Sequence, residues 1–251
     1  MKKVFANVTL TLGIPMIPIR DTVPHRTRPV VNTVLILANI ALFLYQLTLP
    51  TLLQERLIYT YGVIPSRFLP FHPLHLFGEG LSLLFPLLTS LFLHSGWTHL
   101  IFNMWFLWIF GDNVEDRLGH SRYLGFYLFA GFSASFLHIL FNASSRIPVI
   151  GASGAIAGVM AAYLLLFPYS RILTLIPVFV FIPLFIEIPA YLFILFWFMT
   201  QLLSGTVSLL SLTSGGIAWW AHVGGFLAGI FVVLRVRKRE KRRYVNPSLY
   251  S

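Results

Sequence analysis

The chain has 251 residues, of which 57% are hydrophobic and only 10% are charged. Soluble domains carry roughly 25% charged residues, so this composition excludes an ordinary soluble domain and predicts a helical membrane protein. The absence of cysteine excludes disulfides and thiolate catalysis, and the net charge of +10 comes from basic residues near the two ends and in short loops, which indicates membrane orientation and no nucleic-acid binding.

Six segments are apolar and of a length suited to crossing a membrane as helices. They lie at 30–49, 97–112, 121–141, 153–168, 184–204 and 217–236. We therefore expect an all-α membrane protein with a bundle of six transmembrane helices. The expected organisation is an N-terminal cytoplasmic segment at 1–29, a six-helix domain at 30–236 and a basic C-terminal tail at 237–251.

Two apolar stretches leave alternatives open. The segment 83–94 is short and contains Pro86, which favours an interfacial or re-entrant segment over a span. The stretch 172–204 is long enough for two passes, with breaks at its three prolines. In its inner part lies Glu187, for which we expect an interfacial position near the inner end of the fifth span.

The distribution of basic residues decides between six and seven spans. With six spans and cytoplasmic N- and C-termini, all Lys and Arg residues except Arg56, Arg67 and Arg146 lie on the inside. This is a strong positive-inside bias. A seventh span would move the basic tail to the outside, so we expect six.

Four polar side chains then fall at one depth near the outer face. His99 and Asn103 lie in the first turns of the second span, Ser153 opens the fourth, and His222 lies in the first turns of the sixth. At 1.5 Å per residue, all four are within about 10 Å of the outer helix ends. Polar residues at membrane depth are costly and mark functional sites by default.

A serine and a histidine can form an activated nucleophile, because the imidazole takes the hydroxyl proton. Ser153 would be the nucleophile and His222 the general base and acid. None of the eight acidic residues is expected near His222, so a dyad is favoured over a triad, and packing would have to orient the imidazole.

A tetrahedral intermediate also requires hydrogen-bond donors. The backbone N–H of Ser153 lies at a helix N-terminus and the side chains of His99 and Asn103 supply further candidates. Gly151 would let a substrate backbone approach closely. The loop 204–216, rich in Gly, Ser and Thr, predicts a polar cavity that opens outward.

Two pairs of glycines predict that the helices bearing Ser153 and His222 pack closely. Gly154 and Gly158 have the GxxxG spacing in one helix, and Gly225 and Gly229 have it in the other. Small residues at this spacing let helix backbones approach in lipid. Such an approach is needed for a hydrogen bond between the two side chains.

These motifs together resemble the rhomboid family of intramembrane serine proteases. The resemblance rests on His94-xxxx-His99-xxx-Asn103, on Gly151-x-Ser153-Gly154 and on Ala221-His222-x-Gly-Gly225. It covers residues 30–236 and implies cleavage of transmembrane proteins near an external membrane face, without a metal or other cofactor.

The resemblance also implies residue roles. Ser153 matches the nucleophile and His222 the general base, whereas His99 and Asn103 match oxyanion-stabilising positions and His94 matches a structural position. The fifth span and the loop after it resemble a substrate gate. Some members carry an aromatic residue four positions after the serine that stacks on the histidine. Here Ala157 occupies that position, so His222 must be oriented differently.

Two other functions are considered. A catalytically inactive relative would bind transmembrane helices, but such a protein is expected to lack the serine or the histidine, and both are present. A small transporter would favour internal repeats and a site at the midplane, neither of which the sequence indicates. The lack of cysteine and of a large soluble domain favours a prokaryotic plasma membrane, with the active site opening to the external face. Substrates, cleavage-site preference and oligomeric state do not follow from the sequence.

Overall fold

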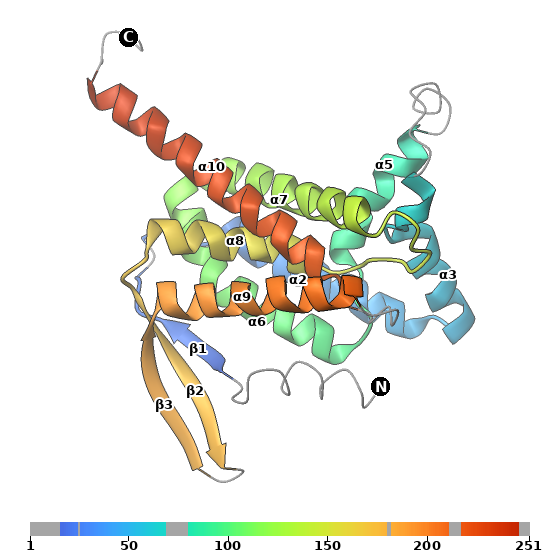
Figure 1. Cartoon of the computed structure of the whole chain (residues 1–251), viewed down its shortest axis with the longest axis horizontal. Helices are drawn as coiled ribbons and strands as arrows, with labels where there is room; N and C mark the ends of the chain where they lie inside the picture. Colours follow the sequence, from blue (N-terminus) through green and yellow to red (C-terminus); the bar gives the residue numbers. More distant parts are fainter. Residues whose placement is uncertain (1–15, 25, 69–79, 180–181, 211–216, 246–251) are drawn as a thin grey trace.

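The computed structural model describes residues 16–24, 26–68, 80–179, 182–210 and 217–245. The long helices run side by side and form a bundle (Figure 1). These helices are α2 (Val30–Thr48), α6 (Trp97–Leu118), α7 (His120–Phe141), α8 (Ser153–Leu166), α9 (Ala190–Leu210) and α10 (Trp219–Val245). Their starting residues agree with five of the six predicted spans within two residues.

Four of these helices are long and apolar enough to cross a membrane: α2, α7, α9 and α10. The other two, α6 and α8, do not meet both conditions. Helix α8 has only 14 residues, and α6 has 22 residues but ends in a charged turn. Every residue of α8 from Gly154 to Tyr163 is buried, because its neighbours in the bundle surround it. A central helix that is covered by protein does not need a full membrane-spanning length.

The two ends of the bundle are distinct. We call the end where α6, α8 and α10 begin the site side, and the opposite end, where α7 and α9 begin, the tail side (right and left in Figure 1). The site side also holds α3 (Thr51–Tyr61), a short η1 (Pro65–Phe68), α5 (Gly80–Thr89) and η2 (Ser90–Phe92). Helix α5 contains Pro86 and has 10 residues, in agreement with the expectation that 83–94 is not a full span.

The prediction of an all-α fold is wrong on the tail side. A three-stranded antiparallel sheet forms there, in the order β1 (Ile17–Asp21), β2 (Arg171–Phe179) and β3 (Ile182–Pro189). In register, Ile172 of β2 pairs with Ile188 of β3, and Ile17 of β1 pairs with Leu175 of β2. The run that was expected to open the fifth span is therefore strand β3. Its β-branched residues and prolines suit a strand of an open hairpin better than a helix interior.

Helix α9 differs from the expected fifth span at both ends. It starts at Ala190 instead of residue 184, so Glu187 lies in β3 and not in a span. There it forms an ion pair with Arg171, with 3.6 Å between the carboxylate and the guanidinium. The helix continues to Leu210, so the first half of the predicted loop 204–216 is helical, and 211–216 lie outside the described residues.

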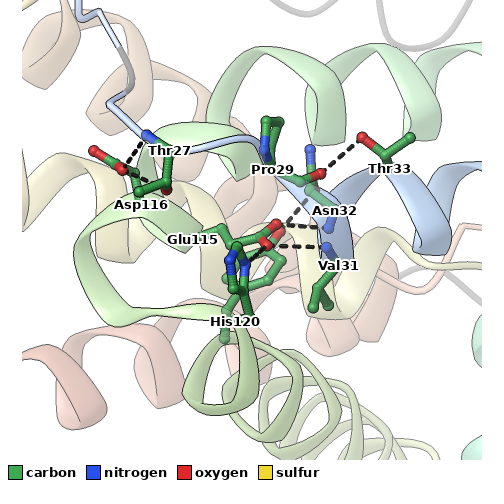
Figure 2. A network of polar contacts seen from close by, with 9 residues as sticks. Thr27, Pro29, Val31, Asn32, Thr33, Glu115, Asp116 and His120 are labelled. Atoms are coloured by element: carbon green, nitrogen blue, oxygen red, sulfur yellow. Dashed lines mark hydrogen bonds and ion pairs between the residues drawn. The ribbon is translucent and has the colours of Figure 1, made fainter.

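A polar network on the tail side joins the end of α6 to the start of α2 (Figure 2). The carboxylate of Glu115 is fully buried and accepts the backbone N–H groups of Val31 and Asn32, at 2.9 and 2.7 Å. These are among the N–H groups that have no partner within a helix. The imidazole of His120 lies 2.5 Å from the same carboxylate. Glu115 thus caps α2 from a neighbouring helix.

The adjacent Asp116 fixes the segment that leads into α2. Its carboxylate accepts hydrogen bonds from the hydroxyl of Thr27, at 2.6 Å, and from the backbone N–H of the same residue, at 2.8 Å (Figure 2). The hydroxyl hydrogen bond is the main reason that the pKa of Asp116 lies below its usual value. The acidic turn of α6 therefore determines where the first helix of the bundle begins.

The glycine pairs of α8 and α10 are in backbone contact, as the GxxxG spacing predicts. A Cβ atom placed on Gly225 would lie 1.8 Å from the carbonyl oxygen of Gly154, and one on Gly229 would lie 2.2 Å from that of Gly158. Only glycine leaves room for this approach. The contact fixes the distance between the helices that carry Ser153 and His222.

Replacing Gly225 by alanine should therefore separate α8 from α10. We expect a melting temperature lower by several degrees, because overpacking of this kind costs roughly 1–3 kcal/mol or more. Thermal unfolding in detergent measures the effect. Gly125→Ala on α7 is the matched control, since a Cβ there meets nothing within 4 Å. Equal melting temperatures for the two variants would contradict the contact.

Candidate active site

Ser153 and His222 lie within hydrogen-bond distance at the site side of the bundle. The Oγ of Ser153, the first residue of α8, is 2.8 Å from Nε2 of His222, in the first turn of α10. Both residues are only partly buried. The structure thus brings together the two residues that the sequence motifs single out, in the geometry that a serine nucleophile and its base require.

The second nitrogen of the imidazole binds a residue that the sequence did not predict. Nδ1 of His222 lies 2.7 Å from Oε1 of Gln201, a buried residue in the middle of α9. The amide nitrogen of Gln201 donates to the hydroxyl of Thr200 and to the carbonyl of Trp197, at 3.0 and 3.3 Å. Its oxygen must therefore accept, so Nδ1 carries the proton and Nε2 is free to accept from Ser153.

The expectation that packing alone orients His222 is therefore wrong. A hydrogen bond holds the ring, and two aromatic side chains flank it. The ring centroid of Trp197 is 5.8 Å from that of His222, and the ring of Trp219 approaches edge-on at 6.3 Å. Ala157 is fully buried in α8, and these contacts replace the stacking aromatic residue that its position lacks.

The loop before Ser153 faces the two predicted oxyanion residues. Gly151 has a φ of +117°, a left-handed conformation that favours glycine. A Cβ on Gly151 would lie 2.6 Å from Nε2 of His99 and 3.6 Å from Nδ2 of Asn103. Both side chains therefore point to the backbone that precedes the nucleophile. The amide nitrogen of Asn103 is buried and has no hydrogen-bond partner among the described residues.

Helix α8 supplies a further donor at the same place. Its N-terminal cap is Ala152, which is in the helical conformation and makes no side-chain hydrogen bond to the helix. The backbone N–H of Ser153 is thus one of the terminal N–H groups that lack an intrahelical acceptor. With Asn103 and His99, it forms a group of donors around the loop at Gly151, where the helix dipole also favours negative charge.

His94 lies next to His99, before α6. Its ring packs edge-on against that of His99, with 5.0 Å between the centroids, and the side chain is almost fully buried. The side-chain amide of Gln46 on α2 bonds both the N–H and the carbonyl of His94, each at 3.2 Å. The hydroxyl of Ser95 lies 3.1 Å from Nδ1 of His99. These contacts fix the turn that positions His99.

Comparison with known proteins identifies the family. The model of the rhomboid domain matches residues 82–239, which is more than half of the chain. The chain belongs to the rhomboid family. The matched region contains all the predicted site residues and also Gln201.

Similar rhomboid proteins occur in eukaryotes and bacteria. The chain is 28% identical to Rhomboid protein 1, mitochondrial, of Saccharomyces cerevisiae over 61% of its length, and 31% identical to RHOMBOID-like protein 6, mitochondrial, of Arabidopsis thaliana over 66%. These matches cover 43% and 48% of the two relatives. A shorter match, 45% identical over 31% of the chain and 15% of the relative, is to the Rhomboid protease GluP of Bacillus subtilis.

These relatives correct one expectation from the sequence. A prokaryotic plasma membrane does not fit the mitochondrial designation of the two longer matches. The rhomboid domain and the four helices long enough to cross a membrane agree with a multi-pass membrane protein.

Proposed function

We propose that this rhomboid protein is an intramembrane serine endopeptidase that hydrolyses peptide bonds in or next to transmembrane segments. The observation that carries the proposal is the chain of hydrogen bonds from Ser153 through His222 to Gln201, at 2.8 and 2.7 Å. An inactive helix-binding relative has no need of a serine hydroxyl held against the accepting nitrogen of an oriented imidazole.

The proposed reaction uses each group in turn. His222 accepts the proton of Ser153 at Nε2 while Oγ attacks the carbonyl carbon of the substrate. The oxyanion that forms accepts hydrogen bonds from the N–H of Ser153 and from Asn103 and His99. His222 then gives its proton to the leaving amine, and the acyl-enzyme is hydrolysed by water that is activated in the same way.

Gln201 performs part of the role that an aspartate performs in a catalytic triad. It accepts from Nδ1 and thereby holds the tautomer with Nε2 unprotonated. As a neutral amide, it does not stabilise the imidazolium that forms during the reaction as strongly as a carboxylate does. We therefore describe Gln201 as a positioning residue.

In the proposed arrangement, six helices span the membrane. Four of them, α2, α7, α9 and α10, are long and apolar enough to do so by themselves, and α6 and α8 are the other two. In this arrangement the tail side of the bundle faces the cytoplasm, where the N- and C-termini are expected, and the dyad lies near the opposite membrane face. The proposed partners are the lipid bilayer and transmembrane proteins as substrates. No metal or other cofactor takes part in the proposed reaction.

A covalent probe tests the proposal directly. Wild-type protein in liposomes is treated with a fluorophosphonate, and the labelled peptide is identified by mass spectrometry. Labelling at Ser153 supports the peptidase. Folded protein that binds a transmembrane peptide but is not labelled would favour the inactive helix-binding relative.

Replacing Gln201 by leucine should lower kcat roughly 10- to 100-fold, a smaller loss than removal of the aspartate of a triad. The leucine has a similar volume but no acceptor for Nδ1. Gln201→Glu restores an acceptor and should retain more activity than Gln201→Leu. Initial rates with a transmembrane substrate in liposomes measure both.

Met199→Leu is the matched control, since Met199 lies on the same helix and is 48% exposed. Its kcat should stay within about twofold of wild type, as surface substitutions usually have small effects. A leucine variant as active as this control would exclude the positioning role.

A further inference from the structure

The β2–β3 hairpin is the largest feature of the described chain that the proposed chemistry does not use. It extends from the tail side of the bundle, across the direction of the helices (Figure 1). Its outer edge is β3, because the strand order is β1-β2-β3, and among the described residues β1 covers β2 only from Ile172 to Leu175. From 172 to 186 the sequence carries no charged residue.

Both faces of the hairpin are apolar beyond its base. Side chains alternate between the two faces of a strand, so neighbouring residues report on opposite faces. Leu184 is 45% exposed and Phe185 is 55% exposed. The exposed charges are confined to the base, where Arg171 and Glu187 form their ion pair. A soluble hairpin normally has one polar face.

Hydrogen bonds to α6 fix the depth of the sheet. The carboxylate of Asp21, at the end of β1, accepts from the side chain of Asn113 at 2.8 Å. Three residues earlier, the carbonyl of Pro18 accepts from the indole N–H of Trp105 at 2.7 Å. Strand β1 therefore runs from the charged end of α6 back along the helix by eight residues, about 12 Å at 1.5 Å per residue.

The strand register shows which residues of the hairpin lie beside β1. Ile17, next to Pro18, pairs with Leu175 of β2, and Leu175 pairs with Phe185 of β3. Ile17 lies beside the middle of α6, because its neighbour Pro18 bonds Trp105. Phe185 lies in the same row of paired residues, two strands from Ile17. Strand β3 also runs directly into α9, which is long and apolar enough to be a span.

We propose that the distal half of the β2–β3 hairpin is immersed in the lipid leaflet on the tail side. Lipid covers both exposed faces there, and the paired charges at the base remain at the headgroups. Lipid-exposed open sheet edges do not occur within the hydrocarbon region. The distal half therefore lies no deeper than the carbonyl level of the leaflet, and the edge of β3 lacks N–H donors at Pro183 and Pro189 because prolines have none.

Depth-dependent fluorescence quenching tests the immersion. The chain has no cysteine, so Leu184→Cys and Phe185→Cys each give one labelling site for an environment-sensitive fluorophore. The matched control is Tyr169→Cys, which precedes β2 and is 86% exposed. The variants of the whole chain are reconstituted in phosphatidylcholine liposomes. In one set of samples, a lipid carries a nitroxide near the carbonyl level of its acyl chain. In the other, iodide is present on both sides of the membrane.

At both hairpin positions, we expect an iodide quenching constant at least threefold lower than at Tyr169, together with stronger quenching by the nitroxide lipid. Iodide quenching equal to that of the control at either position would overturn the proposal. Protection from both quenchers would also overturn it, because protein, such as a second copy, would then cover the hairpin.

A second measurement uses the wild-type protein and needs no substitution. A phospholipid with a diazirine on its acyl chain is photolysed in the same liposomes, and adducts are mapped by mass spectrometry. Adducts within 172–186 support immersion, at a lower frequency than in α9 because the hairpin is shallow. A hairpin free of adducts beside a labelled α9 would contradict it.

Discussion

Replacing Ser153 by alanine is expected to reduce cleavage of a transmembrane substrate to background, a loss on the order of 10⁴-fold or more in kcat. His222→Ala should produce a loss of similar size, because nucleophile and base act as one unit and their effects are not additive. The measurement is the single-turnover rate of cleavage in liposomes, together with fluorophosphonate labelling of the same samples.

The control for these two variants is Ser133→Ala. Ser133 is a partly buried serine on α7, and within the described residues the two ring nitrogens of His222 bond Ser153 and Gln201 instead. The Ser133→Ala variant should cleave the substrate and be labelled like wild type. Cleavage that persists in Ser153→Ala would show that a different group, or a contaminating protease, is responsible. All variants must melt near the wild-type temperature for the comparison to hold.

Replacing Asn103 by alanine should lower kcat on the order of 100-fold, with little change in KM, because the loss of one oxyanion donor destabilises the transition state only. His99→Ala should have a comparable effect. The reason is structural: both side chains point to Gly151, beside the N–H of Ser153. Steady-state rates over a range of substrate densities in the bilayer separate kcat from KM.

Ile101→Ala is the control for the oxyanion variants. Ile101 lies between the two residues on α6 and is 49% exposed. Its kcat should remain within about twofold of wild type. If Asn103→Ala and His99→Ala matched this control, the donors would have to be sought elsewhere in the loop. A rise in KM alone would instead assign both residues to substrate binding.

The contact between Ser153 and His222 could be predicted from the sequence because its determinants are local. Ser153 opens α8 and His222 lies in the first turn of α10, and the glycine spacing on both helices requires close packing. The predicted starts of the two helices place both residues at the same depth. For Gly151 the sequence indicates only that a substrate backbone could approach closely, whereas the structure adds a left-handed φ that favours a glycine there.

Gln201 was missed because no motif surrounds it, although a signal was available. It is the only side-chain amide in α9, and polar residues at membrane depth are functional by default. The sequence argument for a dyad considers only acidic residues as partners of His222. An amide oxygen serves the same geometric purpose, and only the packing of α9 against α10 shows that it lies within reach.

The sheet could not be predicted because its pairing is non-local. Strand β1 lies about 150 residues before its partner β2, and an apolar run of β-branched residues also fits a membrane helix. From the sequence, Pro177, Pro183 and Pro189 fit breaks in a stretch that is long enough for two passes. In the structure, these prolines lie in the strands of the hairpin.

The hydrogen bond between Gln201 and His222 joins two separate helices, and this has a consequence for timing. If α9 moves outward to admit a substrate, as a gate would, Oε1 of Gln201 leaves Nδ1 of His222 and the ring can turn or change tautomer. In the proposed reaction, the open protein would then cleave roughly 10- to 100-fold more slowly, like the Gln201→Leu variant. Peptide bonds that pass the entrance would be cleaved mainly after α9 has closed again, which would favour segments that stay long enough to be enclosed.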